Sequence, residues 1–162
     1  MADSIRMDVK TRGGHRTREI LDRAARQHGI DRVEVGFFAS AKYMDGTPVA
    51  YVAAIHEYGW GNVPERPFLR ASIEKMRDEL VPTIKAAINP ETMSVDSRLA
   101  NRLGSQAVGI IQSTISDGSF EPNPPNSPAT IERKTKGKGG DVTTLIDTGR
   151  MRQSVTWKVV NA

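Results

Sequence analysis

The residues most able to perform chemistry lie in two short motifs, His56-Glu57 and Asp147-Thr148-Gly149. A His-Glu pair begins the helix of a zinc metalloprotease, which needs a second histidine one turn later to hold the metal. Trp60 occupies that position, and His15 and His28 lie far upstream. We therefore expect His56 to be a half-buried histidine at the end of a helix, and we predict no metal site.

The triplet Asp147-Thr148-Gly149 has the sequence of an aspartic-protease motif and follows the apolar pair Leu145-Ile146. That chemistry needs two carboxylates that share a proton, supplied by two copies of the motif or by a homodimer, in an all-β protein. Here Arg150-Met151-Arg152 follows, a segment expected to form a helical turn. We expect Asp147 or Thr148 to cap that turn. The sequence offers no nucleophile–base pair and no cofactor fingerprint, so we predict a protein that is not an enzyme and binds no cofactor.

A basic run lies in a glycine-rich segment and consists of Arg133, Lys134, Lys136 and Lys138. Flexible cationic side chains can bind a nucleic-acid backbone by displacing its counterions. A solvated loop explains the same residues equally simply, and the sequence contains no phosphate-binding loop or RNA-binding motif. The N-terminal arginines at 16, 18, 23 and 26 resemble an ion-paired, solvated helix face. A DNA-binding or packaging accessory that uses the loop 133–138 is therefore the alternative function.

Composition places these motifs in one globular domain. The chain has 162 residues, no cysteine, and 23 basic against 19 acidic side chains, for a net charge of +4. The lack of cysteine excludes a disulfide scaffold, a thiol nucleophile and a cysteine-ligated metal. No stretch is apolar enough to predict a membrane span, and the first ten residues do not have the pattern of a secretory signal. We expect a protein that is made and assembled in a cytoplasm.

The spacing of apolar residues predicts the elements that must position these side chains. Pro82 should kink or split the longest helix. Gly104 and Gly109 in the next helix suggest a close approach of another helix, although simple tolerance of glycine would also explain them. Thr47 and Pro48 are expected to begin the second helix, Thr47 as the cap. The predicted elements are strands over 4–10, 32–39 and 155–159, and helices over 16–28, 49–58, 68–88 and 94–116.

Residues 117–146 are rich in proline and glycine and contain few large apolar side chains. Apart from one short helix from Ser127-Pro128 to Lys134, this segment has too little to bury to order itself in isolation. The sequence therefore predicts an α+β fold, with a small, mostly antiparallel sheet packed by two long helices. Residues 1–116 form the core, 117–146 an extended arm, and 147–162 a turn and strand that complete the core sheet.

Two blocks of sequence resemble a known family. The first is Ile55-His56-Glu57-Tyr58-Gly59 followed by Pro64-Glu65-Arg66-Pro67-Phe68-Leu69-Arg70. The second runs from Ser127 to Lys134 (Ser-Pro-Ala-Thr-Ile-Glu-Arg-Lys) and from Leu145 to Val155. Both are similar to motifs of bacteriophage virion-morphogenesis and tail-completion proteins, in the family's order and separation, and together span about residues 49–160. The lysine- and glycine-rich spacer 135–144 departs from the family pattern.

The resemblance implies a structural virion protein of a long-tailed phage, located in the neck, where head and tail join. Such a protein forms a homo-oligomeric ring, by resemblance a hexamer. The ring contacts the tail-tube protein on one face and a head-completion (connector) protein on the other, with incidental contact to genomic DNA and none to a membrane. The motifs do not distinguish a tail terminator from a head–tail joining adaptor.

The same resemblance suggests which residues serve assembly. Arg66, Pro67, Phe68 and Arg150 would define turns, with Phe68 anchoring the long helix, and a role confined to the fold remains an equal alternative. The candidate interface or motif residues are Arg66, Pro67, Phe68, Arg133, Lys134, Lys136, Lys138, Asp147, Thr148, Gly149 and Arg150.

Overall fold

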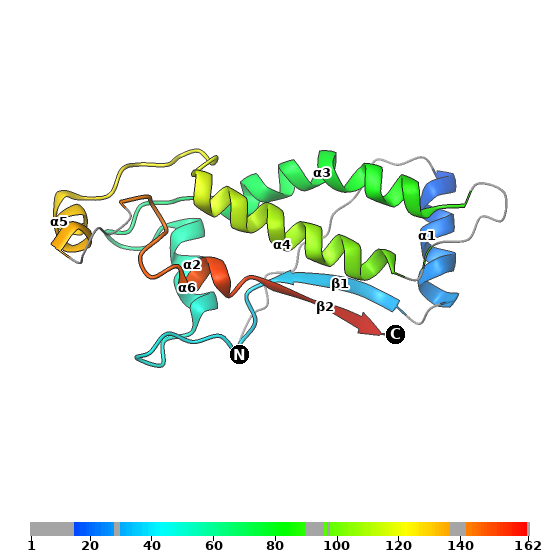
Figure 1. Ribbon diagram of the computed structural model, residues 1–162, viewed down its shortest axis with the longest axis horizontal. Helices are drawn as coiled ribbons and strands as arrows, with labels where there is room; N and C mark the ends of the chain where they lie inside the picture. Colours follow the sequence, from blue (N-terminus) through cyan, green and yellow to red (C-terminus); the bar gives the residue numbers. More distant parts are fainter. Residues whose placement is uncertain (1–14, 28–29, 90–95, 97, 137–141, 162) are drawn as a thin grey trace.

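The computed structural model describes residues 15–27, 30–89, 96, 98–136 and 142–161. The strand predicted over 4–10 and the candidate residue Lys138 lie outside the described residues. The elements, drawn in Figure 1, are α1 (His15–Gln27), β1 (Ile30–Gly36), α2 (Val49–Tyr58), α3 (Phe68–Ala87), α4 (Leu99–Asp117), α5 (Pro128–Lys136), α6 (Arg150–Gln153) and β2 (Thr156–Asn161).

The described sheet has two antiparallel strands, β1 and β2, which come from opposite halves of the chain. Val33 lies opposite Val159, and Val35 lies opposite Trp157. Helix α4 packs on both strands, and α3 packs along α4, an arrangement visible in Figure 1. The predicted α+β class, with a small antiparallel sheet and two long helices, is therefore confirmed.

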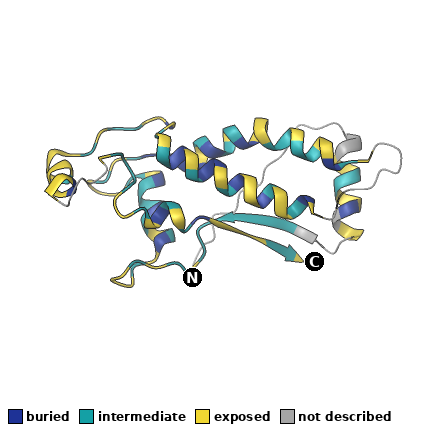
Figure 2. Ribbon diagram, in the orientation of Figure 1, coloured by how far each residue is buried: buried dark blue, intermediate teal, exposed yellow. Residues whose placement is uncertain are grey.

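The core lies where α3, α4 and the start of α2 meet. Phe68, Ile111, Ile115 and Val49 are fully buried there, and Figure 2 shows the buried residues along the facing sides of these helices. Apolar residues three or four positions apart gave α4 one continuous face, as the sequence predicted. The buried members of that predicted face are Leu99, Ala107, Ile110, Ile111 and Ile115.

Helix α3 continues through Pro82, so of the two predicted effects, a kink or a split, the split does not occur. A proline removes the hydrogen bond to the carbonyl four residues earlier, here that of Asp78. Both Pro82 and Asp78 are exposed, so water can solvate the carbonyl that loses its partner.

Two helix starts differ from the predictions. Pro48 occupies the cap position of α2 with no side-chain cap, and Thr47 instead donates its amide to Asp45 Oδ1 at 2.9 Å. Helix α4 begins at Leu99, where the backbone amide bonds the carbonyl of Asp96 at 2.9 Å. The Asp96 carboxylate also accepts a hydrogen bond from the amide of Arg98 at 2.8 Å.

The two glycines of α4 have different surroundings. A Cβ atom added to Gly104 would lie 2.1 Å from Cδ1 of Trp157, whereas one added to Gly109 would meet nothing within 4 Å. The close approach predicted at Gly104 is therefore real, but its partner is an indole on strand β2 rather than another helix. Gly109 has no such neighbour.

Helix α5 and its flanking segments project from one end of the molecule, opposite to α1 (Figure 1). The hydroxyl of Ser127 accepts the amide of Thr130 at 3.3 Å at the start of α5, as its cap position predicts. The helix extends to Lys136, two residues beyond the predicted end.

Candidate functional site

The first motif block folds into a closed corner between α2 and α3. The carboxylate of Glu57, in the last turn of α2, is 1% exposed and accepts the amides of Leu69 and Arg70 at 2.8 and 3.1 Å. These amides belong to the first turn of α3, whose donors have no partner within the helix. Glu57 therefore caps α3 from another helix, and its negative charge lies at the positive end of the helix dipole.

Arg70 closes the same corner from outside. Its Nε donates to Glu57 Oε1 at 2.9 Å and its Nη2 to the Glu57 carbonyl at 2.6 Å, while Glu65 accepts a further hydrogen bond. The hydrogen bonds from Glu57 and Glu65 hold the pKa of the Arg70 guanidinium above its usual value. The guanidinium also lies 5.5 Å from the centre of the Tyr58 ring, within the range of a cation–π contact.

Arg66-Pro67-Phe68 connects this corner to the core and to the arm, residues 117–146. Phe68 is fully buried and packs edge-on against Phe37, with ring centres 6.2 Å apart. Pro67 is buried at the cap position immediately before α3. The Arg66 Nη2 donates to the carbonyl of Pro124 at 2.9 Å, and so links the first motif to the arm.

Arg66 and His56 form a desolvated pair behind that link. Arg66 is 5% exposed, its amide donates to the His56 carbonyl at 2.7 Å, and its Nε has no partner among the described residues. Burial lowers the pKa of the Arg66 guanidinium. Burial, and then the charge of Arg66, lower the pKa of His56, whose Nδ1 likewise has no described partner. His56 is thus a partly buried histidine in the last turn of a helix, as the sequence predicted.

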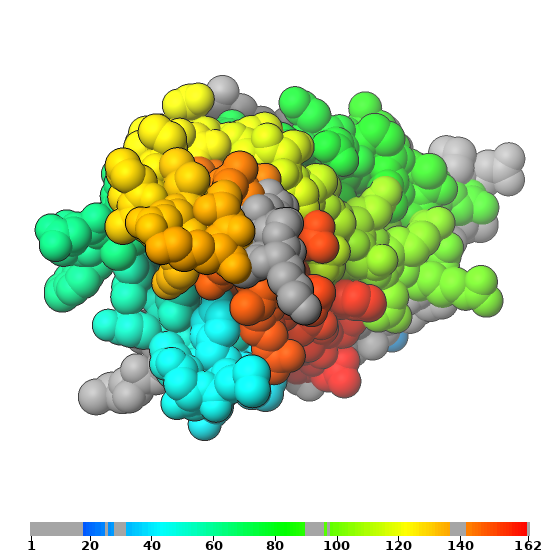
Figure 3. All heavy atoms as spheres, turned by 60° about the vertical axis from the view of Figure 1, so that its left-hand side comes forward, coloured from blue at the N-terminus to red at the C-terminus, as the bar shows by residue number. Residues whose placement is uncertain are grey.

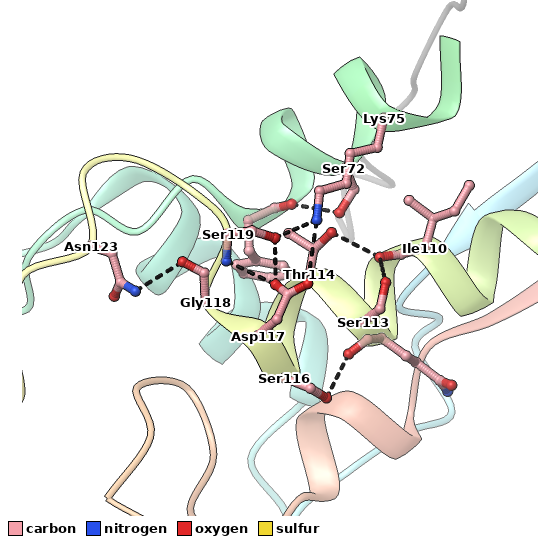
Figure 4. Close-up of polar contacts among 12 residues, drawn as sticks. Ser72, Lys75, Ile110, Ser113, Thr114, Ser116, Asp117, Gly118, Ser119 and Asn123 are labelled. Carbon is pink, nitrogen blue, oxygen red and sulfur yellow. Dashed lines mark hydrogen bonds and ion pairs between the residues drawn. The ribbon is translucent and has the colours of Figure 1, made fainter. Parts of the chain in front are cut away.

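The arm leaves the core at the end of α4, where polar contacts fix its direction (Figure 4). Lys75 of α3 donates to the hydroxyl of Ser119 and lies 3.6 Å from the carboxylate of Asp117. Asp117 accepts the amide of Ser119 at 2.9 Å, and Gly118 ends the helix with a φ of 65°. Phe120 is buried in the core, so the projecting part of the arm begins after it.

Ser119, Lys75 and Asp117 place a hydroxyl beside an amine and a carboxylate, a combination that some hydrolases use. The sequence did not predict this cluster. Ser119 lies just beyond the C-terminal end of α4, where the helix dipole disfavours the negative charge that forms on an attacking oxygen. The surroundings instead suit a cation such as Lys75, which neutralises that helix end. We assign the cluster a structural role.

The two sides of the arm are joined by hydrogen bonds across its base. Thr144 donates to the side-chain oxygen of Asn123 at 2.9 Å, and the side chain of Asn123 donates to the Gly118 carbonyl at 3.1 Å. Further out, Asn126 donates to the carbonyl of Val142 at 2.7 Å. The base of this segment thus has both polar contacts and apolar burial, because Phe120 lies in the core and Leu145 and Ile146 pack against it.

The basic run is engaged within the chain wherever the structure describes it. Lys134 is buried, and its ammonium donates to the carbonyls of Thr143, at 2.7 Å, and Ile146. Arg133 lies 3.7 Å from Asp147, and Lys136 pairs with Glu132 one turn away on α5. Lys134 thus fixes α5 to the returning segment of the arm, residues 142–146, whereas Lys136 pairs within α5 itself.

The second motif block turns the chain back into the core. Gly149 has a φ of 73° at the cap position of α6, and the hydroxyl of Thr148 accepts the amide of Arg150 at 3.3 Å. Arg150 Nε donates to the carbonyl of Lys42 at 3.2 Å, in the turn that precedes α2. Asp147 is exposed and is paired only with Arg133 among the described residues.

The structure thus brings the described candidate residues of both blocks to the end of the molecule from which the arm projects. Within the described part of the chain, no group of three or more His, Asp or Glu side chains could hold a metal ion. No described helix is long and apolar enough to cross a membrane. Comparisons with protein-family models, with curated proteins and with solved structures found no match.

Proposed function

We propose that the protein is a structural subunit of a tailed-phage neck, a tail-completion protein that assembles into a homo-oligomeric ring. In this proposal the ring contacts the tail-tube protein on one side and a head-completion protein on the other. Its work is assembly: it ends the tail tube, presents a docking surface for the head, or does both. It is not an enzyme and needs no cofactor.

The observation that best supports this proposal is the way in which the charged side chains of the two motif blocks are engaged. Their charged side chains are turned to backbone groups, as in Glu57 to the α3 amides, Arg66 to Pro124 and Lys134 to Thr143. Groups engaged in this way are poor catalysts but good supports for a projecting arm. A ring subunit needs such a combination, a rigid core and a projection that reaches its neighbour.

The test is a shortened arm with its base intact. Replacing residues 125–142 by two glycines retains Pro124, which accepts from Arg66, and the hydrogen bond between Thr144 and Asn123. We expect a folded protein, by circular dichroism, that forms no rings in electron micrographs and does not restore infectivity to a phage lacking the gene. A shortened protein that restores infectivity would overturn the proposed role of the arm.

Particles made without the protein distinguish the two neck roles. Tails of abnormal length without heads indicate a terminator, and tails of normal length beside unattached full heads indicate a joining adaptor. The DNA-binding alternative predicts submicromolar duplex affinity with a steep dependence on salt. Arg133, Lys134 and Lys136 already contact groups of their own chain. We therefore expect only weak binding to duplex DNA.

A further inference from the structure

Arg66 is a buried cation that no carboxylate pairs with among the described residues. It is 5% exposed, and its guanidinium donates to a described partner only through Nη2, to the carbonyl of Pro124 at 2.9 Å. Its buried Nε has no such partner. Buried charges are normally paired with an opposite charge, because removing an ion from water is costly. Arg66 is therefore held at this corner by a neutral group, and it would regain hydration by moving into water.

The bond from Arg66 to Pro124 connects the arm to the corner between α2 and α3. Figure 3 shows this end of the molecule, with residues of the arm in yellow and orange in front. Hydrogen bonds further out join the two sides of the arm to each other, from Asn126 to Val142 and from Lys134 to Thr143. Loss of the Arg66 bond would therefore loosen the arm from this corner without opening the arm itself.

His56 lies beside Arg66 at the same corner. Its carbonyl accepts the Arg66 amide at 2.7 Å, and its buried Nδ1 has no partner among the described residues. A neutral imidazole can leave Nδ1 without a proton, whereas a protonated imidazole carries an N–H at both nitrogens and a positive charge. Protonation would therefore place a buried donor without a described acceptor, and a second cation, beside Arg66.

The remaining charges around α2 do not neutralise this pair. Most charged side chains on the elements next to α2 bind groups of their own: Asp45, Glu57, Glu65, Arg70, Arg150 and Arg152. Glu121 of the arm is exposed. Burial, and then the charge of Arg66, lower the pKa of His56, and no described carboxylate acts against them.

We propose that protonation of His56 releases Arg66 from Pro124 and so frees the arm to move. Two cations repel each other more strongly at a buried corner than in water. Arg66 is the group that can leave, because its long side chain can carry the guanidinium out to solvent, whereas His56 belongs to the last turn of a helix. Its departure also lets water reach the unpartnered Nε. The arm is thus held where the imidazole is neutral and loosened at a pH well below about 6.5.

The inference concerns the arm of a single chain, so it does not depend on self-association. The chain has no cysteine, which allows two spin labels to be placed on introduced cysteines in the full-length protein. Ala129→Cys labels α5 and Glu79→Cys labels α3, both at exposed positions. Electron–electron double resonance then measures the distance between the labels, with an excess of unlabelled chain to isolate distances within one copy. We expect a narrow distribution at pH 7.5 and its loss, to a broad one, at pH 5.5.

Control variants separate release of the arm from unfolding. Labels at Glu79→Cys and Ser105→Cys, on the two long helices, should keep a narrow distribution at both pH values. His56→Gln should keep the distribution between α3 and α5 narrow at both pH values, because glutamine does not become charged. Arg66→Met should make it broad at both, with circular dichroism to check that this variant is folded.

Several results would overturn the inference. A wild-type distribution that stays narrow at pH 5.5 would show that the arm is not released. Broadening that persists in His56→Gln would assign it to another group, and a narrow distribution in folded Arg66→Met would show that Arg66 does not hold the arm. Broadening between α3 and α4 together with α5 would mean that acid unfolds the core instead. None of these results would bear on the proposed ring.

Discussion

The carboxylate of Glu57 accepts hydrogen bonds from both the backbone amide and the Nε of Arg70, at 3.1 and 2.9 Å. One side chain thus caps helix α3 and orients the arginine that covers the corner. The Glu57 side chain is 1% exposed, whereas that of Arg70 is 51% exposed.

Glu57→Gln is expected to lower the free energy of unfolding by about 2 kcal/mol or more, because hydrogen bonds to a buried charged group contribute about 1.5–3 kcal/mol each. Urea denaturation followed by circular dichroism measures the change. Glu65→Gln is the matched control: Glu65 also binds Arg70 but is 42% exposed, so its loss should cost less than about 1 kcal/mol. Equal losses for the two variants would contradict the capping role of Glu57.

Replacing each of the two glycines of α4 by alanine should change the stability of the protein in opposite directions. Gly104→Ala should destabilise the protein by about 1–3 kcal/mol, because the new methyl group would overlap the base of the Trp157 indole. Gly109→Ala should stabilise it by about 0.4–1 kcal/mol, since the site is open and alanine restricts the unfolded chain. Thermal denaturation of the two variants checks both signs, and a stabilising Gly104→Ala would show that β2 can move away from α4.

Local patterns predicted the helices and strands because their causes lie within a few residues. The apolar spacing of α4 and the cap of α5 at Ser127 are examples. The cap expected at Thr47 was wrong, because Pro48 occupies the cap position of α2 and Thr47 lies one residue before it, with its amide bonded to Asp45. Residue type alone does not determine which of two neighbouring residues begins a helix.

The candidate site depended on distant partners and was predicted less well. Lys134 has the sequence context of a solvated lysine, but the carbonyls that bury it come from residues 143 and 146, across the arm. Glu57 was considered only beside His56, in a motif that we rejected as a metal site, whereas its hydrogen-bond partners are amides in the next helix. Neither partner can be identified from spacing, because the turn between the elements determines which groups meet.

The buried ammonium of Lys134 leads to a local prediction. Lys134→Met should speed amide hydrogen exchange in α5, corresponding to a local loss of about 1–3 kcal/mol, because the carbonyls of Thr143 and Ile146 lose a charged donor. Exchange in α4 should not change. Lys136→Met removes only an exposed pair with Glu132 and should alter α5 by less than about 0.5 kcal/mol. Indistinguishable exchange in the two variants would mean that Lys134 does not hold α5.

His56 makes the stability of the fold depend on pH. Burial and the charge of Arg66 lower its pKa in the folded protein, so between that lowered pKa and the unfolded value of about 6.5 the unfolded chain binds more protons. The full contribution of His56 to the free energy of unfolding is therefore present above about pH 6.5, and it is lost as the pH is lowered toward the folded pKa.

The measurement is urea denaturation at intervals between pH 5 and pH 7.5, a range that avoids most carboxylate titration. The chain has three histidines, so His15→Gln combined with His28→Gln leaves His56 as the only one. That variant should retain the loss of stability below pH 6.5, and adding His56→Gln should remove it. A slope that persists without His56 would assign the pH dependence to other groups and leave the buried pair of His56 and Arg66 without a role in it.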